Sequence, residues 1–296
     1  MIEHDRFPLS QQTTSNDTYR IGLLDSGVGG LSVLREVYRQ LPAVAVSYIG
    51  DTANVPYGDK PIPVLRDLAI RLTSKLIDSG VSAVIMASGT STVAGLEPAR
   101  LLFPDTPIFG VIEPGAKAAV AHTDGPIGVM ATTATCHSLA FTHAIQHMDA
   151  NRPVFEMPCP RFVPLVESGR ANSEEAVDAC MEYLRPLVHD RVSAIILGCT
   201  HFPFLIESLH AALERMGTEH RPVFVDPAVD AVKDAGTALG IDMSKKTPVG
   251  RTDFFCTGNP QLFAENASLL LGTQVTDVQY LDLAIASGRQ VAEHNL

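Results

Sequence analysis

A cysteine and a histidine two residues apart are the strongest candidates for chemistry in this chain. Cys199 directly follows the apolar run Ala194 to Leu197, which is typical of a buried strand, and a helical stretch comes after it. The N-terminus of a helix favours the thiolate form of a cysteine, and His201 could relay a proton to or from it. The pattern therefore predicts an acid/base thiol. A buried structural cysteine is the alternative interpretation.

The same pattern occurs a second time, with one important difference. Residues 82–90 align without gaps against residues 193–201, and Ser88 stands at the position of Cys199. Each segment runs from an apolar strand through a small residue to a candidate reactive group. This repeat predicts two related lobes that present one reactive group each to opposite faces of a substrate.

Two glycine-containing turns follow the first and second predicted strands. The turn from Asp25 to Gly30 lets backbone N–H groups approach a carboxylate or a phosphate closely. It has neither the glycine spacing of a dinucleotide-binding loop nor the lysine of a Walker loop. Asp25 could orient or deprotonate a neighbouring group, or simply cap the next helix. The turn Pro56-Tyr57-Gly58 presents amides and a phenol that could hold the polar end of a substrate, although such turns are also common without a function.

The remaining candidates carry weaker signals. Glu167 ends a mostly apolar stretch, and most glutamates in such a place are simply solvated. Because no CxxC pair or Cys/His ligand spacing occurs, we expect neither a disulfide framework nor a zinc site, and no metal ligand is predicted. The other cysteines are assigned to packing: Cys136, Cys159, Cys180 and Cys256.

Short apolar runs alternate with helical patterns, and this alternation must position the candidates. Helical periodicity covers residues 31–41 and 61–79. Continuous apolar strands indicate parallel sheets that are covered on both faces. We therefore expect an α/β fold with two doubly wound, mainly parallel-sheet domains, in which sites lie beyond the carboxyl ends of the strands. The predicted strands are 21–24, 44–49, 83–87, 107–112, 127–130, 194–197 and 223–225.

The repeat also predicts a domain division. Residues 1–112 together with 223–296 would form the first α/β domain, and residues 113–222 would form the second. The two domains would be related by internal pseudo-symmetry, with the active site in the interdomain cleft.

Composition excludes several classes of protein. The chain has 296 residues, 46% of them hydrophobic and 19% charged, which is typical of a soluble globular protein. A formal net charge of -11 argues against binding to nucleic acid or to an anionic membrane, because both need clustered Lys and Arg. No apolar run is long enough for a membrane span. The polar start, residues 1–18, lacks the apolar region of a secretory signal, so we expect a cytoplasmic protein.

Taken together and in order, these motifs closely resemble the glutamate racemase family, within the aspartate/glutamate racemase superfamily. The resemblance runs from about residue 21 to about residue 272, and four segments in register carry it. These segments are residues 24–33, 50–58, 162–167 and 197–203.

The resemblance implies a cofactor-independent racemase. Members of the family interconvert the enantiomers of an amino acid without a metal or pyridoxal, using two cysteines that face each other across the Cα atom. Their product D-glutamate feeds peptidoglycan synthesis, and similar enzymes are commonly homodimers. For this chain the resemblance implies a small dicarboxylic amino acid as substrate and Cys199 as the second catalytic thiol. It further implies acid/base support from Asp25, Glu167 and His201, and substrate contacts from Ser26, Pro56, Tyr57, Gly58, Thr90 and Thr200.

The chain departs from the family at the first thiol. Where the family has Ala-Cys-Asn-Thr, this chain has Ala87-Ser88-Gly89-Thr90, so both a catalytic cysteine and a substrate-contacting asparagine are missing. A hydroxyl is a far weaker acid than a thiol, whose pKa is about 8.5. Two-base racemisation is therefore expected to be impaired unless Asp25 activates Ser88. An introduced Cys-to-Ser change would not account for Gly89.

Three other functions remain open on these residues. The chain could act on another substrate or in one direction only. It could be a one-cysteine decarboxylase of the kind that acts on disubstituted malonates. It could also be an amino-acid-binding protein that kept the cleft and lost the chemistry.

Overall fold

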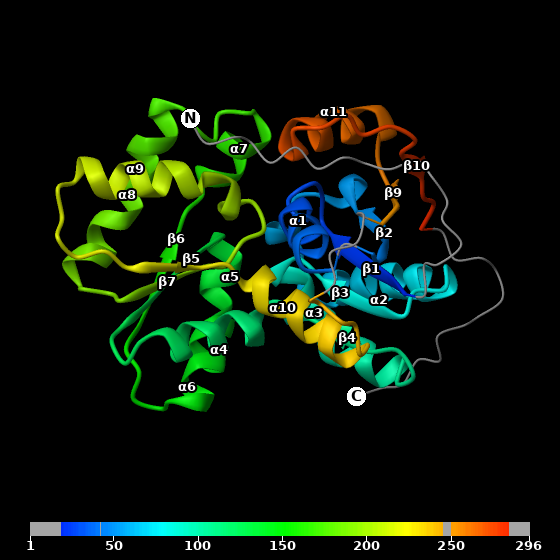
Figure 1. The fold of residues 1–296 in the computed structure, drawn as a ribbon, viewed down its shortest axis with the longest axis horizontal. Coiled ribbons are helices and arrows are strands. Elements are labelled where there is room, and N and C mark those ends of the chain that lie inside the picture. Colours follow the sequence, from blue (N-terminus) through cyan, green and yellow to red (C-terminus); the bar gives the residue numbers. More distant parts are fainter. Residues whose placement is uncertain (1–18, 42, 245–249, 284–296) are drawn as a thin grey trace.

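Two parallel sheets organise the chain (Figure 1). The computed structural model describes residues 19–41, 43–244 and 250–283. The first sheet has the strand order β10-β9-β2-β1-β3-β4. Its strands are β1 (Arg20–Asp25), β2 (Ala45–Gly50), β3 (Ala83–Met86), β4 (Ile108–Phe109), β9 (Thr252–Cys256) and β10 (Gln279–Tyr280).

The second sheet repeats the central arrangement of the first. Its order is β6-β5-β7-β8, so the order second-first-third-fourth recurs in both lobes, and every pairing is parallel. Ser88 follows the third strand of one sheet and Cys199 follows the third strand of the other. The strands are β5 (Ile127–Ala131), β6 (Val154–Pro158), β7 (Ala194–Leu197) and β8 (Val223–Val225).

Helices connect the strands and cover the faces of both sheets (Figure 1). In the first lobe they are α1 (Leu31–Gln40), α2 (Ile62–Asp78), α3 (Gly89–Leu102), α10 (Pro227–Ala238) and α11 (Pro260–Leu271). In the second lobe they are α4 (Ile112–His122), α5 (Thr133–Ser138), α6 (Ala140–Met148), α7 (Phe162–Glu167), α8 (Glu174–His189) and α9 (Ile206–Arg215). Short 3-10 turns are η1 (Thr52–Asn54), η2 (Tyr57–Asp59) and η3 (Phe202–Leu205).

The register brings the strand ends to a common edge in each lobe. Asp25 pairs with Gly50, and Leu24 pairs with Met86, so the segments that follow β1, β2 and β3 emerge together. In the second lobe Met130 pairs with Leu197 in the same way. The strand cores are fully buried because helices cover both faces, which explains their continuous apolar sequence.

The predicted α/β class with two parallel sheets is confirmed, and so are the helices expected at 31–41 and 61–79. Three strands were missed: β6, β9 and β10. The residues of β6 are only partly buried and those of β10 are exposed, so neither forms the continuous apolar run that marks the central strands.

The domain division stays a prediction, but one boundary needs adjustment. Val223–Val225 forms β8, which pairs with β7, so these three residues belong to the second sheet and not to the first domain. The chain returns to the first lobe with α10, which packs against both α1 and α4. The predicted N-terminal tail, residues 1–18, lies outside the described residues. None of the helices in the described ranges combines the length and apolar character that crossing a bilayer requires.

Candidate active site

The strand-end segments of the two lobes lie against each other. A Cβ atom added to Gly89 would lie 3.4 Å from the carbonyl oxygen of Gly198. A Cβ atom added to Gly29 would lie 2.5 Å from Nδ1 of His201 and would also collide with Thr200. The glycine turn and the Ser88 segment of the first lobe therefore lie beside the Cys199 segment of the second.

Three side chains of the second lobe form a hydrogen-bonded chain of a kind that can relay a proton. The Sγ atom of Cys199 lies 3.8 Å from Nδ1 of His201, and Nε2 of His201 lies 3.1 Å from Oε1 of Glu167. Cys199 is partly exposed, whereas His201 is only 6% exposed. The partly exposed thiol is thus connected through an imidazole to a carboxylate on α7.

His201 holds its proton strongly in this setting. Burial by itself lowers its pKa, but contacts with the Cys199 thiol and the Glu167 carboxylate, and the nearby charge of Asp25, raise it to about 10. The imidazole is therefore protonated at neutral pH, where its positive charge stabilises a negative charge that develops on Cys199 or on a substrate.

Asp25 is a fully buried carboxylate of the first lobe. Its Oδ2 atom accepts a hydrogen bond of 3.1 Å from the N–H of Gly27, and its Oδ1 atom has no hydrogen-bond partner among the described residues. Burial raises the pKa of this carboxyl, and the charge of His201 opposes that shift. Asp25 thus lies within electrostatic reach of the relay, as a carboxyl with one unused oxygen.

The hydroxyl of Ser88 is hydrogen-bonded to a backbone N–H group and not to a basic side chain. It is the N-cap of α3, where its Oγ accepts a hydrogen bond of 3.4 Å from the N–H of Ser91. Within the described part of the chain, Ser88 makes no hydrogen bond with Asp25 or another carboxylate. The structure therefore offers no activation of this hydroxyl by Asp25.

The phenol of the Pro56-Tyr57-Gly58 turn points inward. The Tyr57 hydroxyl donates a hydrogen bond of 2.6 Å to Oδ2 of buried Asp51, whose Oδ1 accepts one of 2.6 Å from Thr257. In this structure the phenol therefore bonds within the protein, and a substrate contact by the backbone amides of the turn stays a prediction. Gly58 is exposed, and an added Cβ would lie 3.6 Å from the Cβ of Ala134 in α5.

Sequence reasoning missed the segment Thr132 to Thr135, which follows β5. Thr132 caps α5, and its hydroxyl lies 3.0 Å from that of Thr135. The Thr135 methyl group would lie 3.8 Å from a Cβ atom at Gly89. The repeated strand order could have found this segment, because it occupies in the second lobe the position that Asp25 and Ser26 occupy in the first. Ser26, Thr90 and Thr200 are all partly exposed, as substrate contacts would need to be.

A small cavity adjoins Gly89 and Cys199. Its volume is about 10 Å³, and Ser32 and Asp226 line its other side. This is room for about one water molecule. The hydroxyl of Ser32 is buried there and has no hydrogen-bond partner among the described residues. The absence of a side chain at Gly89 thus leaves only a small space behind the thiol.

Comparisons with known proteins agree with this fold. A family model described as Asp/Glu/Hydantoin racemase matches residues 40–235, and the chain belongs to this family of racemases. It is similar to the glutamate racemase of Trichodesmium erythraeum, with 40% identity over 273 residues, which cover 92% of this chain and 98% of the relative.

Solved structures extend the likeness to the whole fold. Glutamate racemase isoform RacE1 from Bacillus anthracis superposes with a TM-score of 0.81 and 30% identity, covering 91% of this chain and all of that chain. The glutamate racemase of Francisella tularensis in complex with D-glutamate gives a TM-score of 0.79 and 28% identity, covering 90% and 99%.

Proposed function

We propose that this protein is a cofactor-independent glutamate racemase in which Cys199 is the principal acid/base. The observation that carries the proposal is the chain from Cys199 through His201 to Glu167, which faces the glycine turn and Ser88 across the cleft. The similarity to glutamate racemases over most of the chain supports glutamate as the substrate.

The proposed reaction begins with transfer of the Cα proton to the Cys199 thiolate. The electrons of the broken C–H bond remain on the substrate as a carbanion, and the imidazolium of His201 lies close enough to stabilise that charge. For inversion, a second proton must reach the opposite face of the Cα atom, from the side of Ser88. Because Ser88 is a weak acid that caps a helix, delivery from this side is the slow step.

Isotope exchange tests the proposal. Each enantiomer of glutamate is incubated with the protein in deuterated water, and loss of the Cα–H signal is followed by NMR. Exchange with inversion indicates that the protein transfers protons on both faces of the Cα atom. Exchange of a single enantiomer without inversion indicates that Cys199 acts alone. If neither enantiomer exchanges, the proposal is wrong, and release of carbon dioxide from disubstituted malonates or simple binding of amino acids becomes the function to test.

Gly29→Ala is expected to slow this exchange by about 100-fold, since a displacement of about 1 Å at a reacting group costs that much. The added methyl group would collide with His201 and Thr200 and push the relay out of place. Gly27→Ala is the matched control, because the nearest atom to its Cβ lies 3.9 Å away, on Val55. Equal rates in both variants would contradict the close packing of the two lobes at Gly29.

Three further properties complete the proposal. The resemblance to glutamate racemases supports a homodimer, which analytical ultracentrifugation would detect. It also supports a role in supplying D-glutamate for the peptidoglycan of the cell wall. A cytoplasmic location is the third property that we propose, and cell fractionation would test it.

A further inference from the structure

We propose that an ionic clamp made by Arg170, Glu175 and Arg161 positions Glu167 against His201. This proposal rests on the function proposed for His201 and Glu167. The three clamp residues do not touch the reacting groups, so they are positioning residues and act through the helix that carries Glu167.

Glu167 is the last residue of α7, a helix of six residues. So short a helix is not stable by itself in water, and its position has to be set by contacts with its surroundings. The turn that ends it contains Gly169 at a φ of 72°, a left-handed conformation that suits glycine. A Cβ atom at Gly169 would lie 3.1 Å from Leu269 of α11, so this turn also borders the first lobe.

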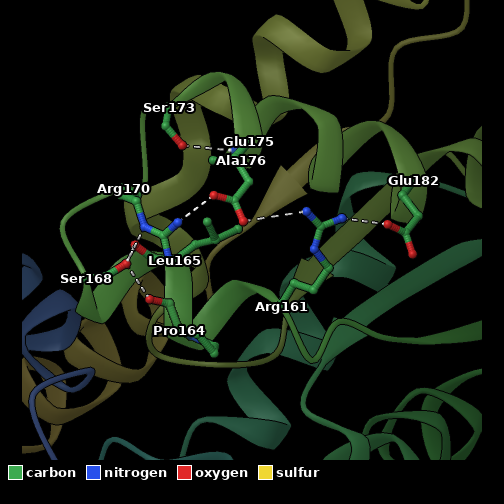
Figure 2. A network of polar contacts seen from close by, with 9 residues as sticks. All are labelled: Arg161, Pro164, Leu165, Ser168, Arg170, Ser173, Glu175, Ala176 and Glu182. Atoms are coloured by element: carbon green, nitrogen blue, oxygen red, sulfur yellow. Dashed lines mark hydrogen bonds and ion pairs between the residues drawn. The ribbon is translucent and has the colours of Figure 1, made fainter.

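The clamp connects both ends of α7 to α8 (Figure 2). At the C-terminal end, Arg170 donates a hydrogen bond of 2.9 Å to Ser168 and one of 2.5 Å to Glu175. The hydroxyl of Ser168 donates in turn to the carbonyl oxygen of Pro164, at 2.7 Å.

At the N-terminal end, Arg161 lies 3.9 Å from the other carboxylate oxygen of Glu175 and 2.8 Å from Glu182. Glu175 therefore joins an arginine from each end of α7, as Figure 2 shows. The buried side chains Phe162, Leu165 and Val166 anchor the inner face of α7. The ionic contacts add a restraint on its outer side, at both of its ends.

Glu167 depends on that restraint because little else holds its carboxylate. Its side chain is 47% exposed, and its one hydrogen bond in the described structure goes to His201. Three groups face His201: Cys199 from its own loop, Glu167 from α7 and Asp25 from β1. If α7 shifts, His201 loses the contribution of Glu167 and releases its proton at a lower pH.

The test follows the titration of His201 directly, without substrate. The ring C–H signal of His201, assigned by its loss in His201→Gln, is measured by NMR between pH 6 and pH 11 in the full-length protein. Arg170→Ala and Glu175→Gln are each expected to lower the titration midpoint by about 0.3 to 0.7 pH unit, as loss of an exposed ionic contact allows. Glu167→Gln is expected to lower it further.

Arg215→Ala is the matched control. Arg215 also pairs with acidic residues of α8, at 2.8 Å from Glu174, but it comes from α9, and its ion pairs among the described residues are with α8 and not with α7. Its removal should leave the midpoint unchanged. Arg170→Lys keeps a charge opposite Glu175 but loses the planar fork, so its midpoint should fall between those of the wild type and Arg170→Ala.

The clamp is overturned if Arg170→Ala titrates like the wild type, or if Arg215→Ala shifts the midpoint equally. The proposal is also overturned if Glu167→Gln leaves the His201 midpoint unchanged. Glu167 would then not affect the pKa of His201, and its position would not matter. None of these results depends on racemisation, so failure of the clamp and failure of the proposed reaction are separate outcomes.

Discussion

Replacing Cys199 with alanine is expected to abolish Cα-proton exchange of glutamate, with a loss of at least about 1000-fold, since acid/base groups contribute up to about 10,000-fold. The reason is that Cys199 is the partly exposed thiol with a hydrogen-bonded imidazole beside it. His201 and Glu167 would keep their hydrogen bond, but the thiol that exchanges a proton with the substrate would be missing. The measurement is the initial rate of deuterium incorporation for each enantiomer.

Cys180→Ala is the control for removing a thiol. Cys180 lies fully buried on α8, and burial raises its pKa to about 12, so it carries no thiolate at neutral pH. Its variant should lose some stability through the small cavity that it leaves but keep the exchange rate. Activity that survives in Cys199→Ala would remove Cys199 from the mechanism.

Ser88→Cys combined with Gly89→Asn is expected to raise the rate of glutamate racemisation by about 100-fold or more. A thiol ionises near pH 8.5, so it can donate and accept a proton at neutral pH where a hydroxyl cannot. The first atom of the asparagine side chain fits without a collision, because a Cβ atom at Gly89 meets its nearest neighbours at 3.4 Å or beyond. The change costs the N-cap hydrogen bond of α3, which is worth about 1 kcal/mol.

The single variants separate the two contributions. Ser88→Cys alone should restore proton transfer on the first-lobe face, seen as exchange of the second enantiomer. Gly89→Asn alone should change the Michaelis constant for glutamate without restoring proton transfer on the first-lobe face. If the double variant racemises glutamate no faster than the wild type, the pocket is built for another substrate or for chemistry from one face.

Local sequence patterns were sufficient for the central elements of the fold. The strands β1, β2, β3, β5 and β7 are continuous apolar runs because each is covered on both faces, and that burial leaves a mark on the sequence itself. The alignment of residues 82–90 with 193–201 likewise predicted two related α/β units, with Ser88 and Cys199 at the ends of equivalent strands. The strand order that the two sheets share was visible only in the structure.

Strands that do not form a continuous apolar run could not be predicted from the sequence. β10 is an exposed edge strand and β6 is only partly buried, so their sequences are not continuously apolar. Val223–Val225 was recognised as a strand, but its membership in the second sheet depends on pairing with β7, which no local pattern specifies.

Sequence by itself determined which chemical groups the site contains: one thiol with a histidine nearby, a glycine turn with its aspartate, and a serine where the family has its first thiol. Only the tertiary structure decided how they are used. It turned the Tyr57 phenol toward Asp51, engaged Ser88 as a helix cap and brought Glu167 to His201 from 34 residues away. The physical reason is that residue type and spacing act over a few neighbours. The direction of a side chain and its partner depend on how the strand ends of two separate sheets pack together.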